Sequence, residues 1–283
     1  MKPITLAVAS GKGGTGKSSV SASLVTSVPG LLAVDADVEE PNLSLLLDAN
    51  PLETTLVSLR VPAIDKDRCT RCGQCVSACM FGALTMFGDS PPQVNDLCHG
   101  CGLCSMVCPE KAITEVDKPI GEIRHCRTAK GGELYEGRLH VGMPNPVPVI
   151  EDLVKTVLDM DVPKVIDCAP GNACPMVAGV RHADAVLLVT EPTPFGAADL
   201  DLALQAVVDL GKPVGVIVNR SDLAAADIRS LASKYGAPVL AEFPFSRAVA
   251  EAYAEGIPPS SVDTRWESGL REIWGYFERM LDR

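Results

Sequence analysis

Short apolar runs alternate with segments of helical period along most of the chain. Six of the runs have the length of a strand and lie at residues 4–9, 31–34, 164–167, 185–189, 214–218 and 238–243. Most of the segments between them place apolar residues at the spacing of one helix face. This alternation predicts an α/β fold whose mostly parallel sheet carries helices on both faces.

The alternation stops between Leu52 and about Pro144, where cysteines, prolines and glycines become frequent. Near the end of this interruption, residues 121–127 and 133–141 predict the two strands of a hairpin, and a helix is expected over 147–161. We therefore expect a main domain at residues 1–62 and 144–283, an inserted domain at 63–118 and a β-hairpin connector at 119–143.

Composition and charge narrow the class of protein. The chain has 283 residues, 47% of them hydrophobic and 22% charged, which is typical of a globular protein. The net charge of −11 argues against nucleic acid as a partner, because binding by phosphate neutralisation needs a basic surface. No apolar run approaches the roughly 18 to 20 residues that cross a bilayer.

The segment 265–283 predicts an amphipathic helix with Leu270, Trp274 and Phe277 on one face. Its polar face balances acidic and basic residues, whereas a helix that lies on a membrane is usually basic. We therefore expect this helix to pack on the sheet and expect no membrane partner.

One loop has the pattern G-x-x-x-x-G-K-S/T of a phosphate-binding loop. It follows the first predicted strand and precedes a helical segment, which is the context that the pattern requires. Backbone N–H groups and the helix dipole favour phosphate, Lys17 can reach the β and γ phosphates, and Ser18 can hold Mg²⁺. The predicted nucleotide-binding residues are Gly11, Lys12, Gly13, Gly14, Thr15, Gly16, Lys17, Ser18 and Ser19.

Acidic side chains follow two of the predicted strands. Asp35 and Asp37 come after the run 31–34, and Asp167 ends the run 164–167. Because the carboxyl ends of parallel strands form the ligand-binding edge of such sheets, Asp37 and Asp167 are candidate functional residues, with a strand-end cap as the alternative for each, whereas Asp35 is expected to be a structural partner of the phosphate loop. Residues 169–175 follow Asp167 directly, where a loop that senses the γ phosphate belongs.

Eight of the eleven cysteines lie between residues 69 and 108 in two copies of one spacing, C-x2-C-x2-C-x3-C. This run resembles that of bacterial ferredoxins with two [4Fe–4S] clusters, in which the fourth cysteine of each copy serves the other cluster. The resemblance implies one ligand set of Cys69, Cys72, Cys75 and Cys108 and another of Cys98, Cys101, Cys104 and Cys79. Zinc and disulfides are the alternatives, and both fit the spacing less well.

Three cysteines and one methionine fall outside this pattern. We expect Cys126 and Cys168 to be small buried side chains. Cys174 lies in the predicted phosphate-sensing loop, and the sequence leaves its role open. Met80 stands where the first copy of the ferredoxin run usually has proline.

The lysine at position 12 sets the phosphate loop apart from the ordinary pattern. Here the chain resembles the deviant P-loop of the MinD, ParA and nitrogenase iron-protein family. The resemblance implies that Lys12 reaches the partner's nucleotide across a dimer and serves catalysis together with Lys17. It also implies that Asp37 orients the attacking water, that Asp167 holds Mg²⁺ through water, and that Asn219 contacts the purine. A turn-initiating asparagine is the alternative for Asn219.

The order of these features along the chain is similar to that of MinD-superfamily ATPases with an inserted α+β ferredoxin domain. The resemblance implies ATP, Mg²⁺ and two [4Fe–4S] clusters as cofactors. It also implies a nucleotide-dependent homodimer, or a heterodimer with a paralogue. Unpaired cysteines and such clusters belong in a reducing compartment, so we expect the cytoplasm.

Three functions are compatible with this pattern. The favoured one is an ATPase that couples nucleotide-dependent changes to electron transfer with an unidentified redox partner protein. A second is a positioning or assembly switch of the MinD/ParA type with redox-sensing clusters. A third is an iron–sulfur carrier, but carriers of this superfamily use a C-P-x-C pair near the end of the domain, and the sequence has no cysteine after Cys174.

Overall fold

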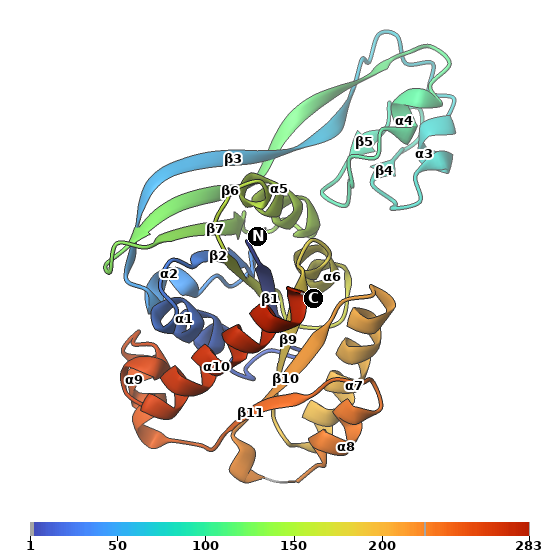
Figure 1. Ribbon diagram of the computed structural model, residues 1–283. Helices are drawn as coiled ribbons and strands as arrows, with labels where there is room; N and C mark the ends of the chain where they lie inside the picture. The colour runs from blue at the N-terminus through green and yellow to red at the C-terminus, as the bar shows by residue number, and fades with distance from the viewer. Residues whose placement is uncertain (1–2, 224, 283) are drawn as a thin grey trace.

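The computed structural model describes residues 3–223 and 225–282, and within these ranges nine strands form one sheet (Figure 1). Its order is β11-β10-β9-β1-β8-β2-β7-β6-β3. The strands are β1 (Thr5–Ala9), β2 (Leu32–Ala36), β3 (Ala49–Ile64), β6 (Ile113–Thr128), β7 (Glu133–Leu139), β8 (Lys164–Cys168), β9 (Ala185–Thr190), β10 (Val214–Asn219) and β11 (Val239–Phe243). All neighbours from β11 to β7 pair in parallel, which confirms the predicted fold class and all six predicted strands.

Helices cover both faces of the parallel part of the sheet. They are α1 (Lys17–Ser27), α2 (Leu43–Leu46), α5 (Val147–Leu158), α6 (Cys174–Val180), α7 (Pro194–Asp209), α8 (Ile228–Ser233), α9 (Arg247–Ala254) and α10 (Thr264–Leu281). Alternate residues of β1 face opposite sides, with Ala7 and Ala9 toward α5 to α8 and Leu6 and Val8 toward α1 and α10. Two apolar cores therefore hold the sheet between them.

The last helix packs on the sheet, as the sequence predicted. Trp266, Leu270 and Phe277 of α10 are buried in the same core as α1, and Trp266 stacks on Phe243 with ring centroids 4.3 Å apart. Over the described ranges, the structure contains no helix with both the length and the apolar character to cross a membrane.

The long strands β3 and β6 form an antiparallel arm that leaves the body of the molecule (Figure 1). The sequence predicted the hairpin of β6 and β7 but placed no strand at residues 49–64. Most of β3 is exposed, so it lacks the apolar face by which a strand is recognised, and its ladder of hydrogen bonds with β6 holds it instead. The expected connector is part of the main sheet, because β7 also pairs with β2.

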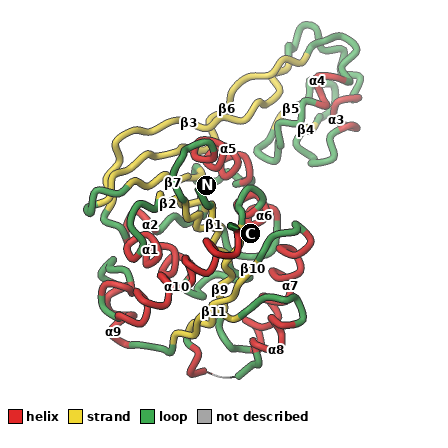
Figure 2. Tube along the Cα trace, viewed as in Figure 1, coloured by secondary structure: helices red, strands yellow, loops and turns green. Residues whose placement is uncertain are grey.

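Residues 65–112, here called the cysteine insert, join the far ends of the two arm strands. They contain α3 (Gln74–Ala78), β4 (Leu84–Thr85), β5 (Gln93–Val94) and α4 (Leu103–Met106), with much of the segment in loops (Figure 2). Its small core consists of Cys75 and Leu84 packed with Ile113, the first residue of β6. A core this small contributes little to the stability of a segment of this size.

Candidate functional site

The phosphate loop joins the end of β1 to the start of α1, as the sequence pattern requires. Gly14 and Gly16 have φ values of 78° and 100°, which side chains rarely adopt. A Cβ atom on Gly16 would also lie 2.4 Å from Nδ2 of Asn219. The conformation of this loop, with its N–H groups ahead of the helix N-terminus, therefore depends on glycine at both positions.

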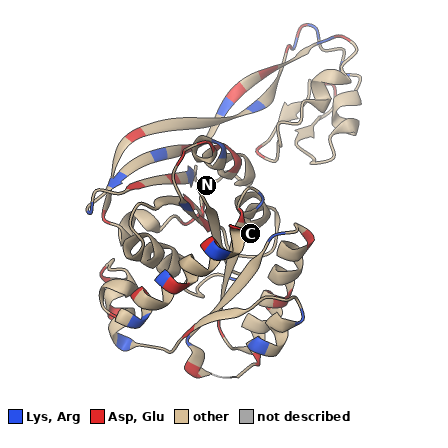
Figure 3. Cartoon of the chain, viewed as in Figure 1, with Lys and Arg blue, Asp and Glu red and all other residues tan. Residues whose placement is uncertain are grey.

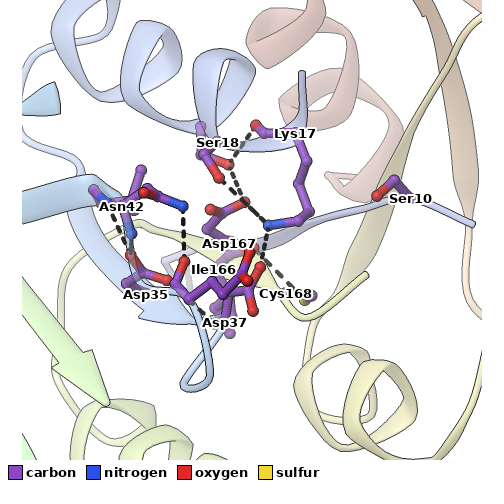
Figure 4. Close-up of polar contacts among 12 residues, drawn as sticks. Ser10, Lys17, Ser18, Asp35, Asp37, Asn42, Ile166, Asp167 and Cys168 are labelled. Carbon is purple, nitrogen blue, oxygen red and sulfur yellow. Dashed lines mark hydrogen bonds and ion pairs between the residues drawn. The ribbon is translucent and has the colours of Figure 1, made fainter. Parts of the chain in front are cut away.

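Lys17 lies at the centre of the site, nearly buried, between two strand-end carboxylates (Figure 4). Its Nζ is 3.1 Å from Oδ1 of Asp167 and 3.3 Å from Oδ2 of Asp37. Burial alone would lower the pKa of the Lys17 ammonium, but the charges of Asp167, Asp37 and Asp35 outweigh it and raise that pKa. Lys17 therefore stays protonated in the folded protein.

Burial raises the pKa of the neighbouring carboxyl groups, because it disfavours their charged form. It raises the pKa of Asp37, and the opposing charge of Lys17 does not cancel the shift. It also raises the pKa of the fully buried Asp35 well above its ordinary value, and the charge of Asp167 adds to this. One cation is shared among three carboxyl groups, so the site carries surplus acid that a divalent cation would neutralise.

Asp35 has a structural role in this arrangement. Its carboxylate accepts hydrogen bonds from the backbone N–H groups of Asp37, Asn42 and Leu43, at 3.2, 2.9 and 2.9 Å. These bonds fix the turn after β2 and the start of α2. Asp35 therefore aims Asp37 into the site without facing the cavity itself.

Two buried polar atoms in the site have no partner, Oγ1 of Thr15 and Oδ2 of Asp167. The other carboxylate oxygen of Asp167 accepts from Oγ of Ser21 at 2.9 Å as well as from Lys17. A buried acceptor without a partner is costly, so an unpaired oxygen beside a phosphate loop points to a ligand or its hydration shell. These donors and acceptors fit a nucleotide with Mg²⁺.

A cavity of about 450 Å³ opens in front of the loop, within the size range of ligand sites. Of the predicted residues, those that line it are Gly13, Gly14, Gly16, Lys17, Ser18, Ser19, Asp37 and Asn219; Gly11, Lys12, Thr15 and Asp167 lie outside its lining. Its far wall consists of Pro244 and Phe245, which precede α9, and of Val249 and Tyr253 within that helix. None of these wall residues was among the predicted site residues, although a proline–aromatic segment directly after a predicted strand could have indicated them.

Lys12 pairs with an acid that was not among the predicted site residues. Its Nζ lies 3.5 Å from Oε2 of Glu191, whose Oε1 accepts from Arg220 at 2.6 Å. Glu191 follows β9 directly, so the rule that selected Asp37 and Asp167 would also have found it. The side chain of Lys12 is 32% exposed, which leaves it accessible at the surface.

Asn219 ends β10 and touches the phosphate loop. Its Nδ2 donates to the carbonyl of Thr15 at 2.8 Å, and it also lines the cavity. The loop of residues 169–173 continues from β8, and the Gly171 N–H donates to the carbonyl of Ser10 at 2.8 Å. Both segments therefore contact the phosphate loop, although they lie far from it in sequence.

The eight cysteines of the insert line two cavities in the two sets that the ferredoxin resemblance implied. One is lined by Cys69, Cys72, Cys75 and Cys108, and the other by Cys79, Cys98, Cys101 and Cys104. Nowhere in the described ranges do three or more His, Cys, Asp or Glu side chains form a site for a single metal ion. Thiols that surround a space in fours fit a cubane, whose irons each bind one thiolate.

The remaining cysteines are placed differently from these sets. Cys126 and Cys168 are buried, as predicted, and burial raises the pKa of each thiol. Cys174 is exposed at the start of α6 and does not line the cavity in front of the phosphate loop.

Comparison with known proteins gives a family and a fold. The profile of the CobQ/CobB/MinD/ParA nucleotide binding domain matches residues 6–259. An uncharacterized protein of Methanocaldococcus jannaschii is 31% identical over 257 residues, which cover 89% of this chain and 89% of that protein. Pyruvate synthase subunit PorD of Methanothermobacter marburgensis is 40% identical over 53 residues, or 18% of this chain and 60% of that subunit.

Solved structures with a similar fold include MinD proteins. The cell division ATPase MinD of Pyrococcus furiosus has a TM-score of 0.58 at 19% identity, over 96% of this chain and 99% of that one. The septum site-determining protein MinD of Pyrococcus horikoshii, complexed with Mg-ADP, has a TM-score of 0.58 at 18% identity, over 96% of each chain.

Proposed function

Because the chain belongs to the CobQ/CobB/MinD/ParA nucleotide-binding family, we propose that it is an ATPase that couples ATP hydrolysis to electron transfer through two [4Fe–4S] clusters. The observation that carries the proposal is the presence, on one chain, of a phosphate loop and two four-cysteine cavities. The arm strand β6 joins them, because it belongs to the main sheet at one end and leads to the cysteine insert at the other.

Nucleotide binding is assigned to the phosphate loop. Its N–H groups, Lys17 and Ser18 would hold the phosphates and Mg²⁺, and Asp167 would bind the ion through water. Lys17 now neutralises Asp37 and Asp167. On turning to the phosphates, Lys17 would release both acids; a Mg²⁺ ion held by Ser18 and Asp167 would supply the positive charge in its place, and Asp37 would then be free to orient the attacking water.

A second copy of the chain, or a paralogue, would complete the site. Lys12 is accessible beside the loop. Within the described ranges, Glu191 is the one acidic side chain that forms an ion pair with it. If Lys12 left Glu191 for a phosphate of the nucleotide bound to the neighbouring subunit, it would supply a cation in trans, as an arginine finger does. Hydrolysis then depends on dimerisation.

Electron transfer is assigned to the cysteine insert. Cys69, Cys72, Cys75 and Cys108 would hold one cluster, Cys79, Cys98, Cys101 and Cys104 the other, and each cluster would carry one electron at a time. The short match to PorD supports this assignment. The insert carries few charges around α3 and α4 (Figure 3), and Met80 and Met106 there are 93% and 82% exposed. An uncharged surface of this kind suits a protein redox partner in the cytoplasm, where thiols stay reduced.

Electron paramagnetic resonance of anaerobically purified, reduced protein tests the proposal. We expect signals of two [4Fe–4S] clusters and a change in signal or reduction rate between MgATP and MgADP, together with ATP hydrolysis. A protein without bound iron would contradict the cofactor assignment. Two clusters that are indifferent to the nucleotide would instead favour a nucleotide switch without redox coupling.

A further inference from the structure

A contact between two residues that the sequence analysis did not single out joins the cysteine insert to the main domain. Asn145 lies in the loop before α5, and its Nδ2 is 3.3 Å from Nδ1 of His99. His99 directly follows Cys98, one of the cysteines around the second cavity. The insert is therefore held to the main domain at a residue next to a proposed cluster ligand.

On the insert side, His99 connects both segments that supply cysteines to the second cavity. Its ring stacks on Phe81, with ring centroids 3.8 Å apart and an interplanar angle of 11°. Phe81 and His99 both line that cavity, and Phe81 lies two residues after Cys79. The loop is also seated tightly on the arm, because a Cβ atom on Gly100 would lie 2.7 Å from Cδ1 of Leu59.

On the main-domain side, Asn145 is fixed to the start of α5. Its Oδ1 accepts from the N–H of Val147 at 3.2 Å. Helix α5 shares a buried core with α6, and Glu151 and Arg181 link the two at 3.8 Å. Asn145 therefore moves with α5, and α5 is packed on α6.

Helix α6 begins where the loop 169–173 ends, and it rests on the strand that carries Asp167. A Cβ atom on Gly179 of α6 would lie 2.8 Å from Sγ of Cys168, the residue after Asp167. A nucleotide-dependent change in this loop would therefore be passed through α6 and α5 to Asn145, because closely packed elements shift as units.

We propose that Asn145 is a positioning residue that transmits the state of the nucleotide site to His99 and to the second cysteine cavity. The inference rests on the proposed function, because it needs both a nucleotide response and bound clusters. It also distinguishes the two cavities. His99 lines the second cavity and not the first, so the nucleotide response belongs to the second cavity.

Two variants cut the contact from opposite sides. Asn145→Ser keeps a side-chain oxygen for the Val147 N–H but is too short to reach His99. His99→Phe keeps a ring to stack on Phe81 and removes Nδ1. Asn95→Ala is the matched control, because Asn95 also donates one hydrogen bond, to Gly82, and accepts one, from Leu97, but both lie within the insert.

Hydrogen–deuterium exchange of the full-length, cluster-loaded protein measures the contact directly, at the amides of residues 98–100. In the wild type, exchange should differ between MgATP and MgADP. Both variants should lose this difference and exchange about fivefold faster, the change expected for one lost hydrogen bond. Asn95→Ala should keep the difference, and Asn145→Ser should keep its ATP hydrolysis.

Paramagnetic resonance on the same samples separates the inference from the proposed function. In the wild type, MgATP should shift the signal of one cluster, and both variants should abolish that shift. Variants that retain the shift and the exchange difference would overturn the role of Asn145 and leave the proposed function intact. A wild-type protein with clusters but no nucleotide response would overturn both.

Discussion

A buried lysine organises the acids of the nucleotide site. Lys17 is 6% exposed and contacts both Asp37 and Asp167, and its pKa is raised although burial opposes its charge. The carboxyl pKa values of Asp35 and Asp37 are also raised, because burial outweighs their share of that one cation. At the residue scale, the site is thus prepared for a ligand that brings phosphates to the lysine and Mg²⁺ to the acids.

Replacement of this lysine should affect both stability and activity. Lys17→Ala leaves buried carboxylates unpaired, so the nucleotide-free protein should lose about 3–5 kcal/mol of unfolding free energy. ATP hydrolysis should fall by about 10² or more. Lys12→Ala is the control for stability, because its partly exposed pair contributes about 1 kcal/mol or less. Urea unfolding and phosphate release measure the two effects, and equal stability losses in both variants would contradict the assignment.

The raised pKa of Asp37 predicts a pH dependence of stability. The folded protein holds this proton more tightly than the unfolded chain, so stability falls as pH rises from the ordinary value of 3.8 through the raised value. Asp37→Asn removes the titration, so its stability relative to the wild type should increase across that interval, by about 1.4 kcal/mol for every pH unit between the ordinary and the raised pKa. Unfolding followed by the fluorescence of Trp266 and Trp274 measures this. A difference that is constant with pH would refute the prediction.

Two short helices shape the cysteine insert. Helices α3 and α4 each follow a glycine in the left-handed region, Gly73 and Gly102, with φ values of 74° and 72°. Three cysteines of each set lie around such a turn, and the fourth comes from the segment after the other helix. At the element scale, neither helix can complete a four-cysteine set alone, so the two cavities depend on α3 and α4 packing together.

Because the fourth cysteine of each set comes from the other half of the insert, single cysteine variants should affect the two clusters differently. Cys108→Ser should remove the cluster of Cys69, Cys72 and Cys75, and Cys79→Ser should remove the other, so each should halve the iron content. Their remaining paramagnetic signals should differ from each other. Cys174→Ser, an exposed cysteine outside both sets, should leave iron and signals unchanged. Loss of the same signal in both ligand variants would show that the sets are assigned wrongly.

The whole molecule separates nucleotide chemistry from the cysteine insert. The phosphate loop follows the end of β1, a central strand of the sheet, whereas the insert is carried at the end of the arm (Figure 1). Such an arrangement leaves the edge of the nucleotide site, with the accessible Lys12, open to a second chain. At this scale, a link between the two sites can pass along the arm strands β3 and β6 or through the contact of Asn145 with His99.

Dimerisation can be tested through Lys12. Lys12→Ala should still bind ATP within a fewfold of the wild type, but its hydrolysis should fall by about 10³, the lower range for a cation supplied in trans. Light scattering should show an ATP-dependent dimer of the wild type that this variant fails to form. Lys155→Ala, an exposed lysine of α5, is the control. Undiminished hydrolysis by Lys12→Ala would mean that the lysine does not act on a partner's nucleotide.

The sequence by itself determined the features that depend on local order. Strand runs, the phosphate loop, the placement of Asp35, Asp37 and Asp167 at strand ends, and the cysteine spacing all follow from short-range pattern. The strands predicted for the parallel sheet were recognisable because burial on both faces demands continuous apolar runs. The packing face of α10 was predictable because its apolar residues repeat at the helical period.

The tertiary structure decided what depends on residues distant in the chain. Strand β3 escaped prediction because its partner β6, not a core, holds it in place. The pairing of Lys12 with Glu191, the wall at Phe245 and the contact of Asn145 with His99 join segments that no local pattern relates. Periodicity records whether a side chain is buried, whereas the identity of its neighbour is fixed only when the elements pack together.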